Sequence, residues 1–103
     1  MRQFDIFRNP DAASARRRPY VVVLQSDLLS GVDTIVVAPL ALPERTNAVS
    51  RLTPIVDVAG SRHVMLIHDL AAIERRVLKR SVGTAAAMRD EILAATDLVF
   101  IGF

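Results

Sequence analysis

Two histidines and an aspartate, His63, His68 and Asp69, are the side chains of this sequence that could carry acid–base or metal chemistry. A metal site needs three or more ligands that converge from fixed directions. Histidines at odd and even positions on or near one strand point to opposite faces of a sheet, so these two do not define such a site. We expect both to be solvated or locally hydrogen-bonded, and we expect neither a metal nor a cofactor.

Nucleophilic catalysis and nucleotide binding find no support in the sequence. Ser26 and Asp27 follow an apolar run without the Gly-x-Ser-x-Gly sequence that surrounds the serine nucleophile of many hydrolases. The four glycines, at positions 31, 60, 83 and 102, are isolated, so no glycine-rich phosphate loop is present. The lack of cysteine excludes a disulfide framework and a thiolate nucleophile, and it is compatible with a reducing cytoplasm.

Arginine dominates the basic residues, and Lys79 is the only lysine. The formal net charge is +2, and the isoelectric point is 9.9. The basic residues cluster at 16–18 and at 75–80. Direct binding of nucleic acid would call for more positive charge and for aromatic residues between the arginines. Because arginine forms planar, bidentate pairs with carboxylates, an acidic peptide is the better-suited partner.

Length and composition indicate a single globular domain over residues 1–103. Apolar residues make up 51% of the chain and charged residues 23%, which is typical of a folded rather than a disordered protein. A chain of this size is close to the point at which oligomerisation helps to bury apolar surface. No secretory signal is recognisable, and no run approaches the roughly 20 apolar residues of a transmembrane helix. We expect a cytoplasmic protein without membrane contact.

Short apolar runs predict an antiparallel sheet. Strands are expected at residues 4–8, 20–24, 35–38, 55–58 and 64–67, with a weaker one at 77–78. The run from 20 to 24 is apolar on both faces, which predicts a central position. Pro39 should end the third strand, because proline cannot donate to a ladder. Residues 12–18 and 43–51 are predicted connections, 59–61 a hairpin turn, and 69–73 one helical turn.

One long helix is expected over residues 84–99. Thr84 is a suitable N-cap, and apolar residues repeat at spacings of 3 and 4 along one face, at Ala85, Met88, Ile92, Ala95 and Val99. Such a helix would be about 24 Å long. Together these elements predict a small antiparallel β-barrel or half-barrel closed by a C-terminal helix.

The end of this helix is apolar where a surface helix would have polar residues and a cap. Val99, Phe100, Ile101, Gly102 and Phe103 follow one another there. A terminus of this kind is either docked into its own core or offered to another chain. The sequence leaves both interpretations open.

Several motifs, in this order along nearly the whole chain, resemble the CcdB toxins of type II toxin–antitoxin systems. They are Gln3-Phe4, Gln25-Ser26-Asp27-Leu28-Leu29, Val37-Ala38-Pro39-Leu40-Ala41, Leu52-Thr53-Pro54-Ile55-Val56, Asp69-Leu70-Ala71 and Leu98-Val99-Phe100-Ile101-Gly102-Phe103. The leucine pair after Gln-Ser-Asp and the aromatic-x-Gly-apolar ending are the specific parts of this resemblance.

The resemblance implies a mainly β fold: an SH3-like antiparallel β-barrel with a small accessory sheet and one C-terminal α-helix, assembled as a homodimer. CcdB proteins are not enzymes; they bind the DNA gyrase A subunit and trap gyrase on cleaved DNA. By position, the gyrase-binding residues are Leu28, Leu29, Asp97, Phe100, Ile101, Gly102 and Phe103. Two depart from the pattern, since the best-known members have Trp at the position of Ile101 and Asn at that of Asp97.

A CcdB-like toxin is neutralised by a cognate CcdA-like antitoxin, and we expect its disordered acidic tail to contact Arg75, Arg76 and Arg80. Without the antitoxin, no direct nucleic-acid binding is expected. A first alternative is a ribonuclease of the related MazF and Kid type, whose members often carry the Arg-Pro that stands here as Arg18-Pro19. A second is a degenerate toxin retained for antitoxin binding and transcription regulation of its operon.

Overall fold

The computed structural model describes residues 1–45 and 51–102, so most of the expected connection at 43–51 and the terminal Phe103 lie outside the described residues. The strands are β1 (Asp5–Arg8), β2 (Tyr20–Val23), β3 (Thr34–Ala41), β4 (Ile55–Val58), β5 (Ser61–Met65), β6 (Ala71–Glu74) and β7 (Ser81–Thr84). Short 3-10 helices connect them: η1 (Asp27–Leu29), η2 (Pro43–Arg45), η3 (Ile67–Asp69), η4 (Arg75–Val77) and η5 (Ala86–Met88). A single α-helix, α1 (Arg89–Phe100), follows in the described part of the chain.

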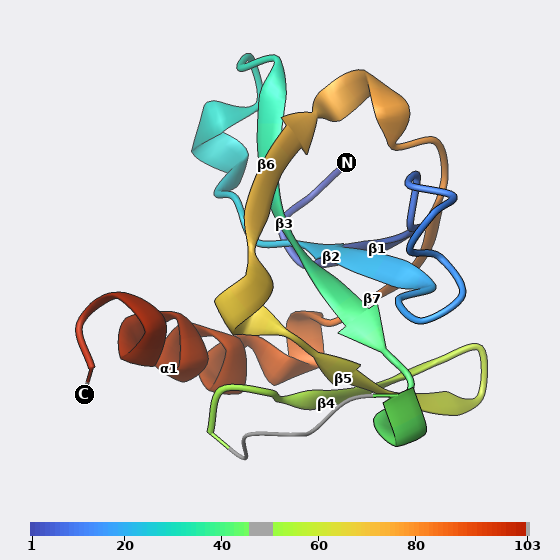
Figure 1. Cartoon of the computed structure of the whole chain (residues 1–103). Coiled ribbons are helices and arrows are strands. Elements are labelled where there is room, and N and C mark those ends of the chain that lie inside the picture. Colours follow the sequence, from blue (N-terminus) through green and yellow to red (C-terminus); the bar gives the residue numbers. More distant parts are fainter. Residues whose placement is uncertain (46–50, 103) are drawn as a thin grey trace.

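The strands form one antiparallel sheet in the order β4-β5-β3-β2-β1-β7, with β6 also paired to β3 (Figure 1). The sheet curls into a nearly closed barrel, and α1 lies across its outside (Figure 1). This confirms the predicted mainly β barrel with one C-terminal helix. The accessory part is the β4–β5 hairpin, which joins the barrel through two residue pairs between β3 and β5, Leu40 with Met65 and Ala41 with Val64.

Strand β2 lies between β1 and β3 and has a hydrophobic core on each side, as its apolar sequence predicts. Val22 belongs to the core beneath α1, whereas Val21 and Val23 belong to the core inside the barrel. The alternation follows from the two-residue period of a strand. Because both faces are covered, β2 holds the barrel and the helix in a fixed relation to each other.

Strand β3 runs through Pro39 to Ala41, so the expectation that Pro39 ends it is wrong. On one edge β3 pairs with β2 from Val37 to Leu40. On the other edge of β3, pairing with β6 ends at Val37 and pairing with β5 begins at Leu40. Pro39 lies where these partners change, and its carbonyl accepts a hydrogen bond from the amide of Leu66 at 2.8 Å. The missing amide hydrogen therefore falls at a gap in the ladder.

The hairpin of β4 and β5 is confirmed, but its second strand covers Ser61–Met65 rather than 64–67, so Ser61 belongs to the strand and not to the turn. Val58 pairs with Ser61, which leaves Ala59 (φ 52°) and Gly60 (φ 81°) as the two central residues. Positive φ at both positions is the geometry that matches the twist of a two-residue hairpin.

The prediction fails between residues 67 and 84. The helical turn is η3 at Ile67–Asp69 rather than 69–73, where β6 begins instead. Val77 and Leu78 are not a strand: Val77 ends η4, and Leu78 is buried in the core inside the barrel. β7 was not predicted, because Ser81–Thr84 is exposed throughout and has no apolar alternation.

Helix α1 begins at Arg89 and has 12 residues, a length of about 18 Å. The predicted start at Thr84 is wrong, because Thr84 ends β7 and η5 comes before the helix. The Thr84 hydroxyl accepts a hydrogen bond from the amide of Ala86, the first residue of η5, at 3.1 Å. The predicted face is confirmed. Ala85, Ile92 and Ala95 are buried in the core beneath α1, with Met88 and Val99 packed against it.

Candidate functional site

The end of α1 is exposed rather than docked. The side chains of Phe100 and Ile101 are 68% and 65% accessible to solvent. The amides of Ile101 and Gly102 both donate to the carbonyl of Asp97, at 2.7 and 3.2 Å. Gly102 has a φ of 88°, a left-handed conformation that ends a helix and that glycine adopts without strain. For Phe100 and Ile101, the docked interpretation of the terminus is therefore wrong.

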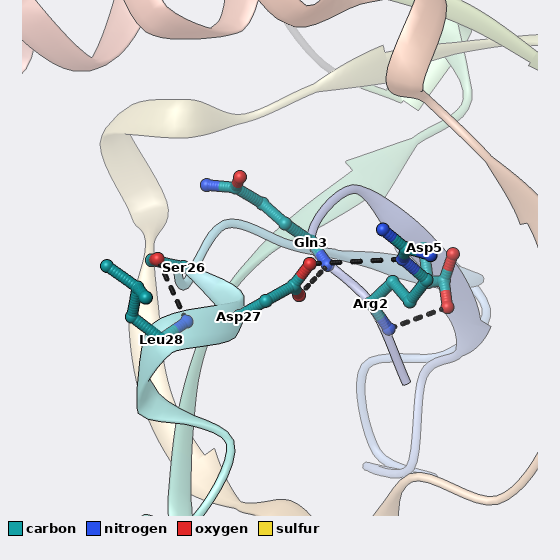
Figure 2. Close-up of polar contacts among 6 residues, drawn as sticks. All are labelled: Arg2, Gln3, Asp5, Ser26, Asp27 and Leu28. Carbon is teal, nitrogen blue, oxygen red and sulfur yellow. Dashed lines mark hydrogen bonds and ion pairs between the residues drawn. The ribbon is translucent and has the colours of Figure 1, made fainter.

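A second exposed apolar feature is the turn η1, which carries the predicted Leu28 and Leu29. Their exposed fractions are 93% and 48%. The backbone beneath them is held firmly: the Ser26 hydroxyl accepts from the amide of Leu28 at 3.1 Å, and Asp27 Oδ1 accepts from the amide of Gln3 at 2.7 Å. Figure 2 shows the Leu28 side chain pointing away from this network.

The network around Asp27 ties η1 to the N-terminal segment (Figure 2). The second carboxylate oxygen of Asp27 lies 3.9 Å from Arg2 Nε. Asp5 in turn accepts a hydrogen bond from the amide of Arg2 at 2.9 Å. The segment before β1 is thereby folded against the turn, and the polar groups of Gln-Ser-Asp have a structural role as turn formers.

Arg75 holds the same turn from the other side. Its guanidinium donates from Nε to the carbonyl of Val32 at 2.9 Å and from Nη2 to the carbonyl of Leu29 at 3.1 Å. Nη1 lies 3.3 Å from the sulfur of Met1. Because its planar donors are occupied within the chain, Arg75 acts here as a clamp on η1. No sequence pattern predicted this contact, because it joins residues more than 40 positions apart.

Met1, Leu28, Leu29 and Val32 are all large apolar residues at least 44% exposed, and we call them the η1 patch. Phe100 and Ile101 form the C-terminal patch. In the view of Figure 1, η1 and the end of α1 lie well apart on the side of the barrel where β6 runs. One chain therefore presents the predicted leucines and the predicted terminal residues as two patches, not one.

The other predicted residues are exposed but differ in their contacts. Asp97 is exposed in the last turns of α1. Arg76 Nε lies 2.6 Å from Glu74 Oε2, and both side chains are mostly in solvent. A groove of about 560 Å³ contains Arg75 and Arg76 together with the carboxylates Asp33 and Glu74. Arg80 lies outside that groove.

The histidines do not share a site. His63 is buried on β5, with Nδ1 placed 2.9 Å from the carbonyl of Ser61 and its ring edge-on to Tyr20. This confirms the expected local hydrogen bond. His68 lies in η3 and not on the strand, so the argument from odd and even strand positions does not apply to it. In residues 1–45 and 51–102, no three His, Cys, Asp or Glu side chains could hold a metal ion.

Arg18, Asp69 and His68 form a half-exposed polar cluster. The sequence indicated His68 with Asp69 and, separately, Arg18 as candidates, but not that Arg18 joins the other two. Arg18 Nη2 lies 2.8 Å from Asp69 Oδ2. His68 Nε2 is 3.9 Å from the other carboxylate oxygen. Arg18 lies in the loop before β2, and His68 and Asp69 lie in η3. Because Arg18 and Asp69 are 51 positions apart, only the tertiary fold brings them together.

The fold and its surface define a small β-barrel protein whose main exposed features are two apolar patches, typical of a protein that acts by binding other proteins. The family model described as "CcdB protein" matches residues 3–102, and the chain belongs to the CcdB family of toxins from toxin–antitoxin systems.

Two solved structures have a similar fold. An endoribonuclease in complex with its cognate antitoxin, from a mycobacterial species, has a TM-score of 0.75 at 10% identity over 96% of this chain and 93% of that one. Mycobacterium tuberculosis toxin MazF-mt6 has a TM-score of 0.73 at 18% identity over 96% of each chain. No curated protein sequence matches the chain. None of the helices in the described residues has the length and apolar character needed to cross a membrane.

Proposed function

We propose that this chain is a cytoplasmic toxin that binds the DNA gyrase A subunit as a homodimer and traps gyrase on cleaved DNA. The observation that carries the proposal is the exposure of Phe100 and Ile101 at the end of α1, within a chain of the CcdB family. Large apolar side chains that are preorganised and solvent-exposed are suited to act as anchors in a protein interface. Leu28, Leu29, Asp97, Gly102 and Phe103 complete the proposed gyrase surface.

A homodimer is supported by the arrangement of the two patches. Within one chain, η1 and the end of α1 do not meet (Figure 1). Strand β6, which runs on the same side, is exposed at Ala71 and Ala72. A two-fold axis on this side would bring the patches of both protomers into one continuous surface, with burial of about 1,200 Å² or more expected for a stable interface. Light scattering at micromolar concentration should give twice the mass of the chain; the mass of one chain would contradict the dimer.

For the antitoxin, we propose a disordered acidic tail that pairs with exposed arginines. Arg76 and Arg80 are exposed and suited to this role, whereas Arg75 already donates to two backbone carbonyls. Exposed ion pairs weaken as salt screens them. Affinity for the antitoxin should therefore fall with rising ionic strength, and an affinity independent of salt would remove the electrostatic part of this proposal.

The decisive experiment adds the purified toxin to gyrase, ATP and supercoiled plasmid, followed by detergent and protease. Trapped gyrase converts the plasmid to linear DNA. We expect linear DNA with the natural chain and none with Phe100→Ala/Ile101→Ala. Ile55→Ala, which truncates a comparably exposed side chain on β4, serves as the matched control and should retain activity. Absence of linear DNA with the natural chain would contradict the proposal.

A ribonuclease is the second candidate, and the cluster of Arg18, Asp69 and His68 is the observation that favours it. A guanidinium beside an acid and an imidazole could stabilise charge and move protons at a phosphodiester. Incubation with messenger RNA distinguishes the two: cleavage that Arg18→Gln abolishes supports the nuclease. A chain that neither traps gyrase nor cleaves RNA, yet binds its antitoxin, would be a degenerate toxin that serves operon regulation.

A further inference from the structure

A groove of about 430 Å³ lies between the end of β1 and the segment that leads into β7. Arg8, Lys79 and Arg80 line it, and no acidic residue does. We call it the β1–β7 groove. In Figure 1 the end of β1 and the segment before β7 lie on the side of the barrel away from the end of α1.

No ion pair within residues 1–45 and 51–102 neutralises the positive charge of this groove. All three side chains are exposed. The ion pairs among the described residues involve Arg2, Arg18, His68 and Arg76 as cations, and not those of the groove. The groove at Arg75 and Arg76 differs, because Asp33 and Glu74 lie in it and balance its charge. Charge complementarity therefore selects the β1–β7 groove for an acidic ligand.

The walls of the groove are apolar and rigid. Pro10, Val77 and Val82 contribute the apolar surface. Asn9 fixes the loop after β1: its side-chain amide donates to the carbonyl of Arg18 at 2.7 Å and its oxygen accepts from the amide of Asp11 at 2.9 Å. A preformed hollow with apolar walls and basic residues suits a chain that alternates acidic and apolar side chains.

The backbone beside the groove offers a further recognition element. β7 is the last strand in the sheet order, and among the described strands it pairs with β1 alone. Its second edge can accept an extended peptide as an added strand, in which successive side chains point to opposite sides. Such a peptide could direct acidic side chains towards Arg8, Lys79 and Arg80 while its main chain pairs with β7.

From these features we infer that the β1–β7 groove is the docking site for an extended acidic peptide segment, supplied by the antitoxin. The assignment to the antitoxin rests on the proposed function, whereas the preference for an acidic peptide rests on the groove alone. It places the electrostatic contact at Arg8, Lys79 and Arg80, and thus retains only Arg80 from the three arginines expected on sequence grounds.

The test uses the full chain and a fluorescent synthetic peptide in which glutamate alternates with valine and threonine. The variant Arg8→Gln/Lys79→Gln/Arg80→Gln should lower its affinity about tenfold, since three exposed pairs are lost. The charge-matched control Arg16→Gln/Arg17→Gln/Arg62→Gln removes three exposed cations outside the groove and should change affinity much less. Circular dichroism confirms the folding of both variants.

Amide hydrogen exchange provides an independent readout, with slower exchange in Ser81–Thr84 expected on peptide binding. Equal losses in the two triple variants would overturn the inference, as would tighter binding of an unstructured RNA of equal charge at the same groove. Both variants should still trap gyrase. If the natural chain binds the peptide in the groove but traps no gyrase, the proposed function fails and the peptide site stands.

Discussion

Arg75 and Leu29 are joined by a hydrogen bond of 3.1 Å from Nη2 of the arginine to the backbone carbonyl of the leucine. The bond links η4 to η1 across 46 positions of the sequence. Because the contact is to the backbone, it fixes where the turn lies and leaves the leucine side chains in solvent. Arg75 thus positions the η1 patch without belonging to its apolar surface.

Replacement of Arg75 should therefore weaken gyrase trapping, because η1 would no longer be held in place. Arg75→Ala removes two hydrogen bonds to carbonyls of η1 and its loop, and about 1 to 3 kcal/mol of stability is expected to be lost. Arg75→Lys keeps the charge but cannot reproduce the planar pair of donors, so it should recover little. The control is Arg76→Ala, because Arg76 pairs with the exposed Glu74 and not with η1 within the described part of the chain. Full trapping by Arg75→Ala would contradict the positioning role.

The conformation of Gly102 gives a prediction for the C-terminal patch. Its φ of 88° disfavours other residues, yet a Cβ added there would meet no heavy atom within 4 Å. Gly102→Val should redirect the residues after α1 and abolish gyrase binding while the thermal midpoint changes little. Asparagine tolerates the left-handed conformation, so Gly102→Asn should retain more binding. Identical binding by the two variants would show that the backbone conformation at 102 does not matter.

Deletion of residues 101–103 distinguishes the interpretation of the terminus as a binding surface from its interpretation as part of the core. Ile101 is 65% exposed, so its loss should cost little stability but should abolish trapping. A buried side chain of similar size would cost about 2 to 5 kcal/mol. The deletion variant is compared with the natural chain by thermal unfolding and plasmid cleavage. A much lower melting temperature together with full toxicity would refute the interaction-surface interpretation.

Ile101→Trp should raise the affinity for gyrase. The exposed position accepts a larger side chain without repacking, and tryptophan is a frequent anchor of interface hot spots. Surface plasmon resonance against the gyrase A subunit measures the change. Leu93→Trp, at another exposed position of α1, controls for non-specific binding through an added exposed tryptophan. Equal gains from the two substitutions would argue against a specific anchor site.

Two adjacent residues of α1, one buried and one exposed, provide a matched pair of alanine substitutions. Ile92 is 1% exposed and Leu93 is 41% exposed. Ile92→Ala should lower the free energy of unfolding by about 2 to 5 kcal/mol, and Leu93→Ala by much less. Chemical denaturation measures both values. Similar values for the two would show that α1 does not dock through the predicted face.

The sequence predicted the elements whose side chains repeat with a clear period. The run at 20–24 indicated a central strand, and the spacing of Ile92 and Ala95 indicated the buried face of the helix. β6 and β7 were missed because their side chains are mostly exposed and carry no alternation. Pro39 was misjudged because the change of partners beside β3 depends on distant strands.

For the candidate site, sequence alone indicated the exposed residues but not the hydrogen bonds that hold their backbone in place. The apolar terminus and the leucine pair were visible as motifs, and Phe100, Ile101, Leu28 and Leu29 proved to be exposed. The clamps on η1, from Asp27 to Gln3 and from Arg75 to Leu29, span 24 and 46 positions. No local pattern encodes a hydrogen bond between a side chain and a remote carbonyl, so these contacts required the structure.

The pairing of β1 with β7 bears on when the toxin becomes active during its synthesis. Asp5 pairs with Thr84, and the carbonyl of Phe4 accepts from the amide of Ala85 at 2.8 Å. The first strand therefore waits for almost the whole chain before it gains its outer partner, and contacts of such long sequence separation form slowly. The β1–β7 groove is lined from both sides of this pairing, so the antitoxin site proposed above is complete only when the last strand has joined the first.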